Sequence, residues 1–201
     1  EIDHTYDGGL SEYVTLMNAK KNKIHDDVIH VIGSKIGDKG EVYVEIGLQW
    51  TDSYSESIDC FTNIIHNVDG GTHLSGLRSS LTRTVNSYAQ SRNLLKNLSS
   101  LSGDDVREGL SAVVSIKHPE PSFNAQTKAK LVTSEVAGIV EQIVNDKLGE
   151  YFEENPSVAR SIVDKAAMAS KAREAARKAR DLTRRKGVLE GGGLPGQLAD
   201  F

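Results

Sequence analysis

The stretch SFNAQTKAKLVT, residues 122–133, places Gln126, Thr127 and Lys128 where a loop is expected. Loops often carry binding groups, because a rigid scaffold on either side fixes their position. A lysine ammonium is a compact positive charge that suits a terminal phosphate, and a glutamine amide can donate to the same phosphate oxygens. Exposed lysines are also common. The residues alone therefore leave two interpretations open, a solvated surface loop or a phosphate contact.

A second set of candidates is basic. Residues 72–95, which read as a helix, carry Arg78, Arg83 and Arg92, and such side chains can contact nucleic-acid phosphates without reading bases. Residues 171–186 carry eight Lys or Arg against two acidic residues. That segment fits either a solvated helix face or a surface near nucleic acid. Basic residues near a helix C-terminus also complement the helix dipole, which favours the first interpretation.

Other chemistries find little support in the sequence. The six histidines show neither ligand spacing nor cysteine partners, so we predict no metal site. No Walker loop, nucleophile–histidine–acid arrangement or paired-carboxylate motif is visible. The single cysteine, Cys60, cannot form an internal disulfide, which is typical of a reducing compartment. No apolar stretch approaches the roughly 18 residues of a membrane span, so we expect a cytoplasmic protein with no membrane partner.

The strands that position the candidate residues follow from the hydrophobic pattern. Residues 27–36 and 41–50 read as a hairpin joined by the sequence GDKG. Residues 56–65 read as a third antiparallel strand of a meander, and residues 110–118 as another strand that leads into the loop. The alternation in the second strand predicts a polar side and a core side, the latter formed by Val42, Val44, Ile46, Leu48 and Trp50.

Helical periodicity predicts the remaining elements. A short helix is expected over residues 10–17, and a longer one over residues 72–95, capped by its first residue, Thr72. A broad apolar stripe predicts a helix from about residue 134 to the break at Asn155-Pro156. A second helix then runs to about Lys186, with a length of roughly 45 Å. The first six residues read as a short strand.

Several stretches together resemble one family. They are FTNIIHNVDGGTHLSGLRSSLTRTVNSYA, SGDDVREGLSAVVSIKHPEPSFNAQTKAKLVTSEV, ENPSVARSIVDKAAMASKAREAARKARDLTRRK and LPGQLADF. In this order they resemble the transducer domain in the B subunit of bacterial DNA gyrase and its topoisomerase IV relatives. The resemblance covers essentially the whole chain, and the combination of GGTH, DDVREGL, QTK and LPGxLAD is specific. Only Gln197 and Phe201, where the family usually has Lys and Cys, depart from its closing motif.

The resemblance implies a fold and a division of the chain. The fold is α+β, like that of ribosomal protein S5 domain 2, with a mainly antiparallel sheet, helices on one face and a long C-terminal helix. Residues 1–154 would form the core of the transducer, residues 155–186 its long C-terminal helix, and residues 187–201 a linker toward a Toprim domain outside this chain.

The resemblance also implies a function, part of an ATP-dependent type II DNA topoisomerase, an isomerase, with the isolated chain inactive. In this family the Gln and Lys of the QTK loop, here Gln126 and Lys128, contact the γ-phosphate of ATP held by an N-terminal ATPase domain of the same chain. The transducer then relays the nucleotide state to the DNA gate during strand passage and negative supercoiling. The cofactor is ATP, and its Mg²⁺ is bound by domains outside these residues.

Further implied partners are the Toprim domain, the gyrase A subunit in an A2B2 heterotetramer, and double-stranded DNA. Arg78 is the first DNA-facing candidate by motif position, followed by Arg83 and Arg92. Two alternatives remain. One is a stand-alone nucleic-acid-binding module with an S5-like fold and no link to ATP, and the other is a helical adaptor, which the strands disfavour. The sequence does not separate gyrase from topoisomerase IV.

Overall fold

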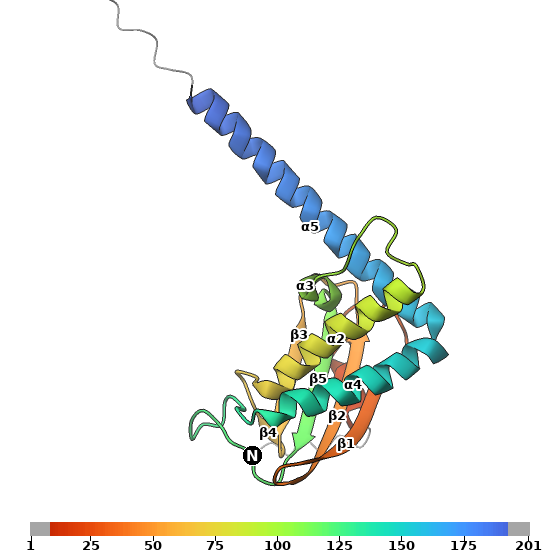
Figure 1. Cartoon of the computed structure of the whole chain (residues 1–201), viewed down its shortest axis with the longest axis vertical. Helices are drawn as coiled ribbons and strands as arrows, with labels where there is room; N and C mark the ends of the chain where they lie inside the picture. Colours follow the sequence, from red (N-terminus) through yellow and green to blue (C-terminus); the bar gives the residue numbers. More distant parts are fainter. Residues whose placement is uncertain (1–8, 193–201) are drawn as a thin grey trace, which may run out of the picture.

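The computed structural model describes residues 9–192, so the strand predicted for residues 1–6 and the closing motif LPGQLADF lie outside the described residues. The chain forms an α+β domain from which one long helix projects (Figure 1). The elements follow in this order: α1 (Gly9–Met17), β1 (Ile29–Gly37), β2 (Gly40–Trp50), β3 (Ser57–Thr62), β4 (Ile65–His66), α2 (Thr72–Ser91), α3 (Gly103–Arg107), β5 (Leu110–Lys117), α4 (Glu135–Glu154) and α5 (Pro156–Gly191).

The predicted hairpin is confirmed as β1 and β2. The two strands pair antiparallel from Ile29 opposite Leu48 to Gly37 opposite Gly40. Gly40 has a φ of 134°, a backbone conformation that glycine adopts at little cost in a tight turn. The apolar positions predicted to face the core are each at most 1% exposed, which confirms the predicted core side of β2.

The order of the strands differs from the predicted meander. The sheet runs β1-β2-β5-β3-β4, so β5 separates β2 from β3. β5 pairs antiparallel with β2 and parallel with β3. The prediction of β3 as the next antiparallel strand after β2 is therefore wrong. Alternation along a strand indicates which side it buries, but carries no information on which strand lies beside it.

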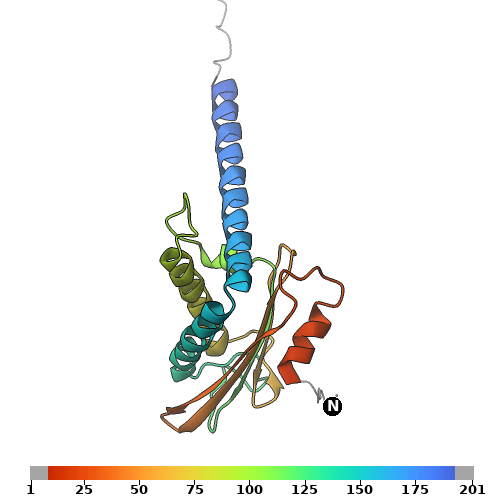
Figure 2. The ribbon, with the colours of Figure 1, turned by 90° about the vertical axis from the view of Figure 1, so that its right-hand side faces the viewer.

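Helices cover both faces of the sheet. Figure 2 shows α2 and α4 on one face of the sheet and the short α1 on the other. The prediction placed helices on one face only, so the position of α1 is an addition to it. Gly47 of β2 lies so close to α1 that an added Cβ would come within 3.0 Å of the Val14 side chain. Gln49, on the side of β2 predicted to be polar, is 1% exposed and accepts a 2.9 Å hydrogen bond from the Asn18 amide. A polar strand position can thus be buried when its amide is satisfied.

The two ends of α2 also differ from the prediction. The capping residue is Gly71, which offers no side-chain cap. Thr72 is the first helical residue, and its buried hydroxyl has no hydrogen-bond partner within residues 9–192. The prediction that Thr72 caps the helix is wrong. The start of the helix is held instead by backbone hydrogen bonds, including the one from the Thr72 N–H to the Leu131 carbonyl. The helix ends at Ser91, four residues before the predicted Leu95.

The long helix α5 leaves the body of the domain partway along its length. Its first turns bury apolar side chains such as Ile162 and Val163, whereas every residue from Lys171 to the last described one is exposed. The helix runs to Gly191, so residues 187–191 are helical where a linker was predicted. Within residues 9–192, no helix combines the length and the hydropathy that crossing a membrane requires.

Candidate functional site

The QTK loop, residues 122–133, joins β5 to α4 and displays its polar side chains to solvent. Gln126, Thr127 and Lys128 are all exposed. A tight turn forms the tip, because the Lys128 N–H donates to the Ala125 carbonyl at 3.0 Å. The Lys128 ammonium lies 5.9 Å from the centre of the Phe123 ring and forms no ion pair with any residue from 9 to 192. Lys128 has a φ of 55°, an uncommon conformation for a residue other than glycine, so the surroundings must hold it.

Backbone hydrogen bonds fix the QTK loop to the segment that starts α2. The Asp69 N–H donates to the Ala129 carbonyl at 2.8 Å, and the Leu131 N–H donates to the Gly70 carbonyl at 3.0 Å. The Thr72 N–H donates to the Leu131 carbonyl at 3.1 Å. These hydrogen bonds connect the loop directly to the N-terminus of α2.

Gly71 makes this close approach possible. Its φ is 141°, and an added Cβ would lie 2.3 Å from the Leu131 carbonyl oxygen. No residue with a side chain fits this position without moving the loop or the helix. The GG of the GGTH motif thus serves the contact between α2 and the QTK loop.

A buried polar network holds the backbone of Lys128 from below. The Asn67 amide nitrogen donates to the Lys128 carbonyl at 2.6 Å. The Asn67 amide oxygen accepts from the Thr62 hydroxyl at 2.7 Å and lies 3.0 Å from Nε2 of His73. Asn67, Thr62 and His73 are each at most 2% exposed. This network joins the end of β3, the approach to α2 and the first turn of α2 to the residue that carries the candidate ammonium.

The network assigns the protonation of His73. The Asn67 oxygen can only accept, so Nε2 of His73 carries the proton and donates it. Its Nδ1 is buried and has no hydrogen-bond partner among the described residues. A proton there would place an unpaired charge in the interior. Burial accordingly lowers the pKa of His73 from 6.5 to about 4, and the ring is neutral near pH 7.

A second cluster fixes the side of the loop that follows β5. The fully buried His118 ring places Nε2 2.6 Å from a Glu135 carboxylate oxygen, and its Nδ1 accepts from the Glu120 N–H at 3.0 Å. The other Glu135 oxygen accepts from the Asp38 N–H in the β1–β2 turn at 2.7 Å. The hydrogen bonds from Asp38 and then His118 lower the pKa of Glu135. The first residue of α4 is therefore tied to the hairpin and to the strand before the loop.

The structure separates the three predicted arginines from the QTK loop and gives each a carboxylate partner. Arg78 lies 2.5 Å from Glu56, which also accepts from Arg107. Arg83 lies 3.8 Å from Glu141 of α4. Arg92 pairs with a glutamate near the end of α4 and lies over the ring of Tyr88. Their charges are thus largely balanced within the domain, and they form no common cluster.

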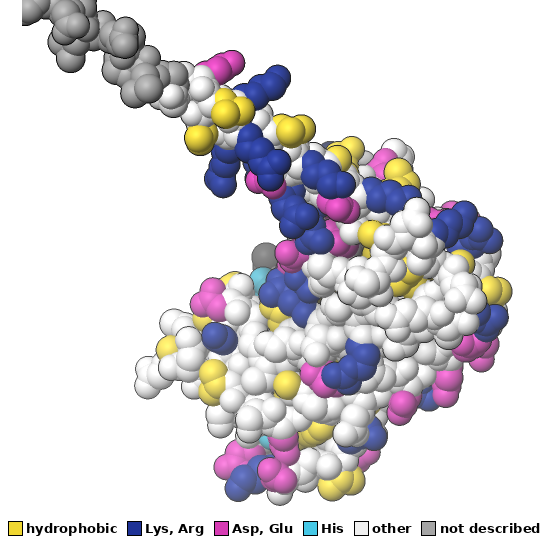
Figure 3. Space-filling view, turned by 45° about the horizontal axis from the view of Figure 1, so that its top comes forward, with side chains coloured by type: hydrophobic (Ala, Val, Ile, Leu, Met, Phe, Trp, Pro, Cys, Tyr) yellow, Lys and Arg dark blue, Asp and Glu magenta, His cyan; other side chains and the backbone are white. Residues whose placement is uncertain are grey.

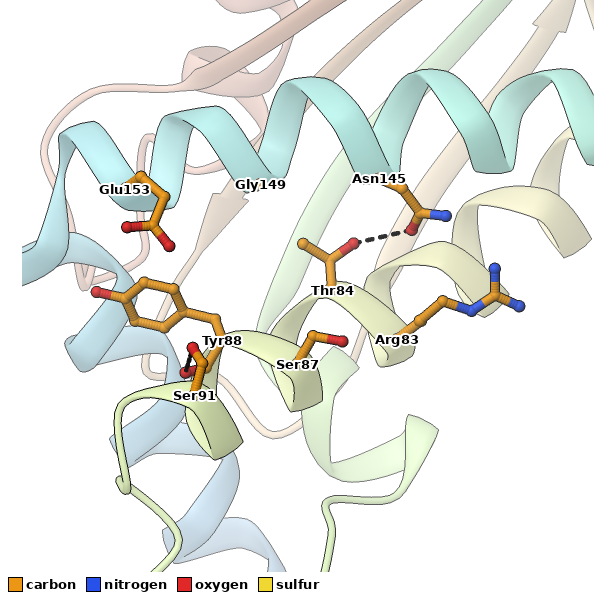
Figure 4. Close-up of a pocket in the computed structure, with 8 residues that line it drawn as sticks. All are labelled: Arg83, Thr84, Ser87, Tyr88, Ser91, Asn145, Gly149 and Glu153. Carbon is orange, nitrogen blue, oxygen red and sulfur yellow. Dashed lines mark hydrogen bonds between the residues drawn. The ribbon is translucent and has the colours of Figure 1, made fainter.

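A groove of about 440 Å³ runs between the C-terminal halves of α2 and α4 (Figure 4). Thr84 donates a 3.0 Å hydrogen bond to Asn145 within it, and Arg83 and Glu153 lie along its length. The QTK loop joins the opposite, N-terminal ends of the same helices. The groove and the loop are therefore separate features.

Other chemistry would depend on the only cysteine of the chain or on the carboxylate and histidine side chains of the described residues. Burial raises the pKa of the Cys60 thiol to about 12, so this side chain stays protonated and inert. Across residues 9–192, no three His, Cys, Asp or Glu side chains gather as metal ligands would. The sequence did not single out Asn67 as functional, because its role depends on contacts with residues far away in the chain.

Comparisons with known proteins define a class. A solved structure of the 43K ATPase domain of Thermus thermophilus gyrase B, in complex with an aminocoumarin, is similar with a TM-score of 0.80 and 38% identity, over 87% of this chain and 46% of that one. The topoisomerase IV ATP-binding domain of Francisella tularensis gives a TM-score of 0.69 and 25% identity, over 84% and 44% of the two chains. The α+β fold with its long helix is thus the one found in these B-type topoisomerase structures.

The sequence narrows this class to one family. A family model described as DNA gyrase B matches residues 9–182. The DNA gyrase B protein of Myxococcus xanthus is 51% identical over 201 residues, which make up 100% of this chain and 24% of that protein. The chain belongs to the DNA gyrase B family. It spans about a quarter of the length of this relative and 31% of the DNA gyrase B protein of Clostridium acetobutylicum.

Proposed function

We propose that this chain is the transducer domain of a gyrase-type DNA topoisomerase, and that its QTK loop senses the γ-phosphate of ATP. The observation that carries the proposal is the contrast within the loop. The Gln126 and Lys128 side chains are exposed, whereas the backbone beneath Lys128 is held by the buried Asn67 and by α2. A contact to a ligand held by another domain requires a loop with a fixed backbone and exposed polar side chains.

The free energy of the two proposed contacts to the γ-phosphate is large enough to shift the domain between two conformations. A hydrogen bond to a charged group contributes about 1.5–3 kcal/mol, so contacts from Gln126 and Lys128 together contribute about 3–6 kcal/mol. Reversing a 1:99 equilibrium takes about 5.5 kcal/mol of differential binding. Contacts present with ATP and lost after phosphate release are therefore sufficient to move one domain relative to another.

The fold offers a route by which that movement reaches the long helix. The QTK loop is bonded to the start of α2 through Thr72 and leads directly into α4, whose first residue is Glu135. α4 passes into α5 at Asn155-Pro156 with a one-residue break. A displacement of the loop would therefore be transmitted to α2 and α4 and, through α4, to α5. In this way α5 would relay the nucleotide state toward the DNA gate.

The proposal includes partners outside these residues. ATP would be bound by an ATPase domain of the longer protein, with its Mg²⁺ held there, and a Toprim domain would follow α5. Residues 1–154 and 155–186 would be the transducer core and its long helix, with the stretch after them leading to the Toprim domain. The gyrase A subunit and double-stranded DNA complete the assembly, which we place in the cytoplasm. The higher identity to the gyrase B structure than to the topoisomerase IV structure favours gyrase.

The test is Lys128→Ala in the longer protein, with Lys130→Ala as the matched control. Both lysines are exposed in the same loop. We expect ATP turnover to fall at least about tenfold in Lys128→Ala, because a hydrogen bond to a charged phosphate is lost. Lys130→Ala should turn over ATP like the unmodified protein, and thermal unfolding should be unchanged in both. Equal ATPase activity in the two variants would instead favour a nucleic-acid-binding module with no coupling to ATP.

A further inference from the structure

Within residues 9–192, Arg173 is the last side chain of α5 that bonds to the body of the domain. Its guanidinium donates 2.9 Å hydrogen bonds to the Asp105 carboxylate in α3 and to the hydroxyl of Ser102, the residue that caps α3. The hydrogen bonds and ion pairs further along α5 stay within the helix. Arg173 therefore lies where the long helix leaves the body, beside α3 (Figure 1).

The spacing of the sequence directs Arg173 toward α3. Ile162, Ala166 and Ala169 are buried, and they follow one another at intervals of four and three residues, so they share one face of α5. Arg173 follows Ala169 by four residues and continues this face. The packed side of α5 thus ends in a charged side chain, at the point where the helix becomes exposed.

The carboxylate that Arg173 contacts is buried. The Asp105 side chain is 3% exposed, whereas that of Arg173 is 52% exposed. Within residues 9–192, Arg173 is the only ion-pair partner of Asp105. Removing one member of such a pair is costly, because the other charge stays in the interior without compensation. A movement of α5 away from α3 would leave Asp105 in that state, so the contact favours one direction of the helix.

A second ion pair between α5 and the body supports the same direction. The Lys165 ammonium lies 3.5 Å from a Glu108 carboxylate oxygen and donates a 3.2 Å hydrogen bond to the Ser53 carbonyl. Lys165 and Arg173 are about 12 Å apart along the helix. Two contacts at this separation fix an axis, whereas a single contact would allow α5 to pivot. Figure 3 shows basic and acidic side chains gathered where α5 leaves the body.

α3 is in turn bonded to α2. The Asn86 amide nitrogen donates to the Leu101 carbonyl at 2.9 Å, and the Leu101 N–H donates to the Asn86 amide oxygen at 2.7 Å. Arg107 of α3 and Arg78 of α2 both donate to the carboxylate of Glu56. The QTK loop is bonded to the N-terminus of α2, so a continuous series of contacts joins the loop, α2, α3 and α5. This series does not pass through α4.

We propose that Arg173 and Asp105 are positioning residues, which make the direction of α5 follow α2 through their contact at α3. The inference rests on the proposed function for its input, a displacement of the QTK loop. It adds a second connection to the one through α4, and this connection acts on α5 at the point where the helix leaves the body. Packed elements joined by hydrogen bonds and ion pairs can carry such coupling.

Two matched pairs of variants separate the contact from general effects of charge. Asp105→Asn is compared with Asp104→Asn, because Asp104 is the neighbouring aspartate of α3, is 84% exposed and pairs with Arg107 rather than with α5. Arg173→Gln is compared with Arg177→Gln, one turn further along, where no bond to another element of residues 9–192 is lost. The members of each pair lose the same charge, so a difference between them reports the contact.

The first readout is the direction of α5 in the 201-residue chain, without nucleotide or DNA. Spin labels at Lys147→Cys in α4 and Arg185→Cys in α5 occupy exposed positions, and the only native cysteine, Cys60, is buried. Position 185 lies about 30 Å beyond Lys165, so a rotation of about 10° moves its label by about 5 Å.

We expect the distance distribution from pulsed EPR to widen by about 5 Å in Asp105→Asn and in Arg173→Gln. It should stay as in the unmodified chain in Asp104→Asn and Arg177→Gln. Circular dichroism should show the same helix content in all variants. If Asp105→Asn does not fold, the Arg173→Gln pair decides the outcome alone. Equal widths within that pair would overturn the proposal.

The second readout uses the longer protein with its gyrase A subunit. Asp105→Asn should turn over ATP like Asp104→Asn, but supercoil DNA about fivefold less per ATP, because the ATP site is intact and the coupling to α5 is weakened. Combining Asp105→Asn with Arg173→Gln should add little to either single change, since both remove the same contact. Unchanged supercoiling per ATP in Asp105→Asn would overturn the role of the contact in coupling.

The EPR result is independent of the nucleotide sensor, because no ATP is present and Lys128 plays no part. Normal ATPase in Lys128→Ala together with a widened distribution in Arg173→Gln would remove the sensor and retain the positioning of α5. Unchanged widths together with a loss of ATPase in Lys128→Ala would remove the positioning residues and retain the sensor.

Discussion

His73 shows how a single buried residue holds the sensor backbone in place. Its Nε2–H donates a hydrogen bond to the Asn67 amide oxygen. The Asn67 amide nitrogen in turn donates to the Lys128 carbonyl. A buried network of this kind stabilises one arrangement only when its members keep their donor and acceptor roles. The neutral ring is therefore part of what fixes the position of Lys128.

The lowered pKa of His73 predicts how stability depends on pH. Burial lowers the pKa of the folded state from 6.5 to about 4, so the unfolded chain takes up the proton more readily. The contribution is complete above pH 6.5 and is lost as the pH falls toward about 4. Between pH 7 and pH 4.5 we expect His73 to account for a loss of about 2–3 kcal/mol in the free energy of unfolding.

Urea unfolding of the unmodified chain and of His73→Asn at both pH values measures this contribution. Carboxylates with a lowered pKa, such as Glu135, lose their contribution to stability mainly below about pH 4.5 and do so in both proteins, so the difference between the two pH dependences isolates the histidine. His73→Asn should show the smaller decrease. An identical decrease in the free energy of unfolding in both proteins would contradict the assignment of His73 as a buried ring that stays neutral in the folded state.

At the scale of elements, the contact between the start of α2 and the QTK loop depends on Gly71. We expect Gly71→Ala to destabilise the chain by about 2 kcal/mol or more, because a Cβ would collide with the Leu131 carbonyl in a backbone conformation that alanine rarely adopts. The control is Gly138→Ala on the exposed face of α4, where nothing lies within 4 Å of an added Cβ. It should stabilise the helix by about 0.5–1 kcal/mol.

Chemical denaturation gives both values, and hydrogen exchange at the amides of Asp69, Leu131 and Thr72 reports whether the contact itself opens. These amides should exchange faster in Gly71→Ala than in Gly138→Ala. Equal stability and equal exchange in the two glycine variants would contradict the view that the loop and α2 act as one unit.

At the scale of the whole molecule, the sequence predicted the elements better than their arrangement. The β1–β2 hairpin, the core side of β2 and the long helices follow from local alternation and periodicity. The insertion of β5 between β2 and β3 does not, because strand neighbours are chosen by contacts between distant segments. The buried Gln49 was also missed, since its partners, Asn18 and the backbone at His25, lie in a different part of the chain.

The same limit applies to the site. The motif QTK identified the candidate side chains by their chemistry and by a family resemblance. The supports of Lys128 come from Asn67 and Gly71, about 60 residues earlier, and a local pattern cannot show that they meet the loop. The prediction ended the long helix near Lys186, whereas the helix continues through Gly187 to Gly191, because an exposed helix tolerates glycine at a modest cost.

The most direct test of the sensor is a structure of the longer protein with a non-hydrolysable ATP analogue bound. The proposal predicts that the Lys128 ammonium and the Gln126 amide lie about 3 Å from γ-phosphate oxygens, with the Asn67–Lys128 hydrogen bond retained. Side chains of both residues directed into solvent, in the presence of a fully occupied analogue, would contradict it.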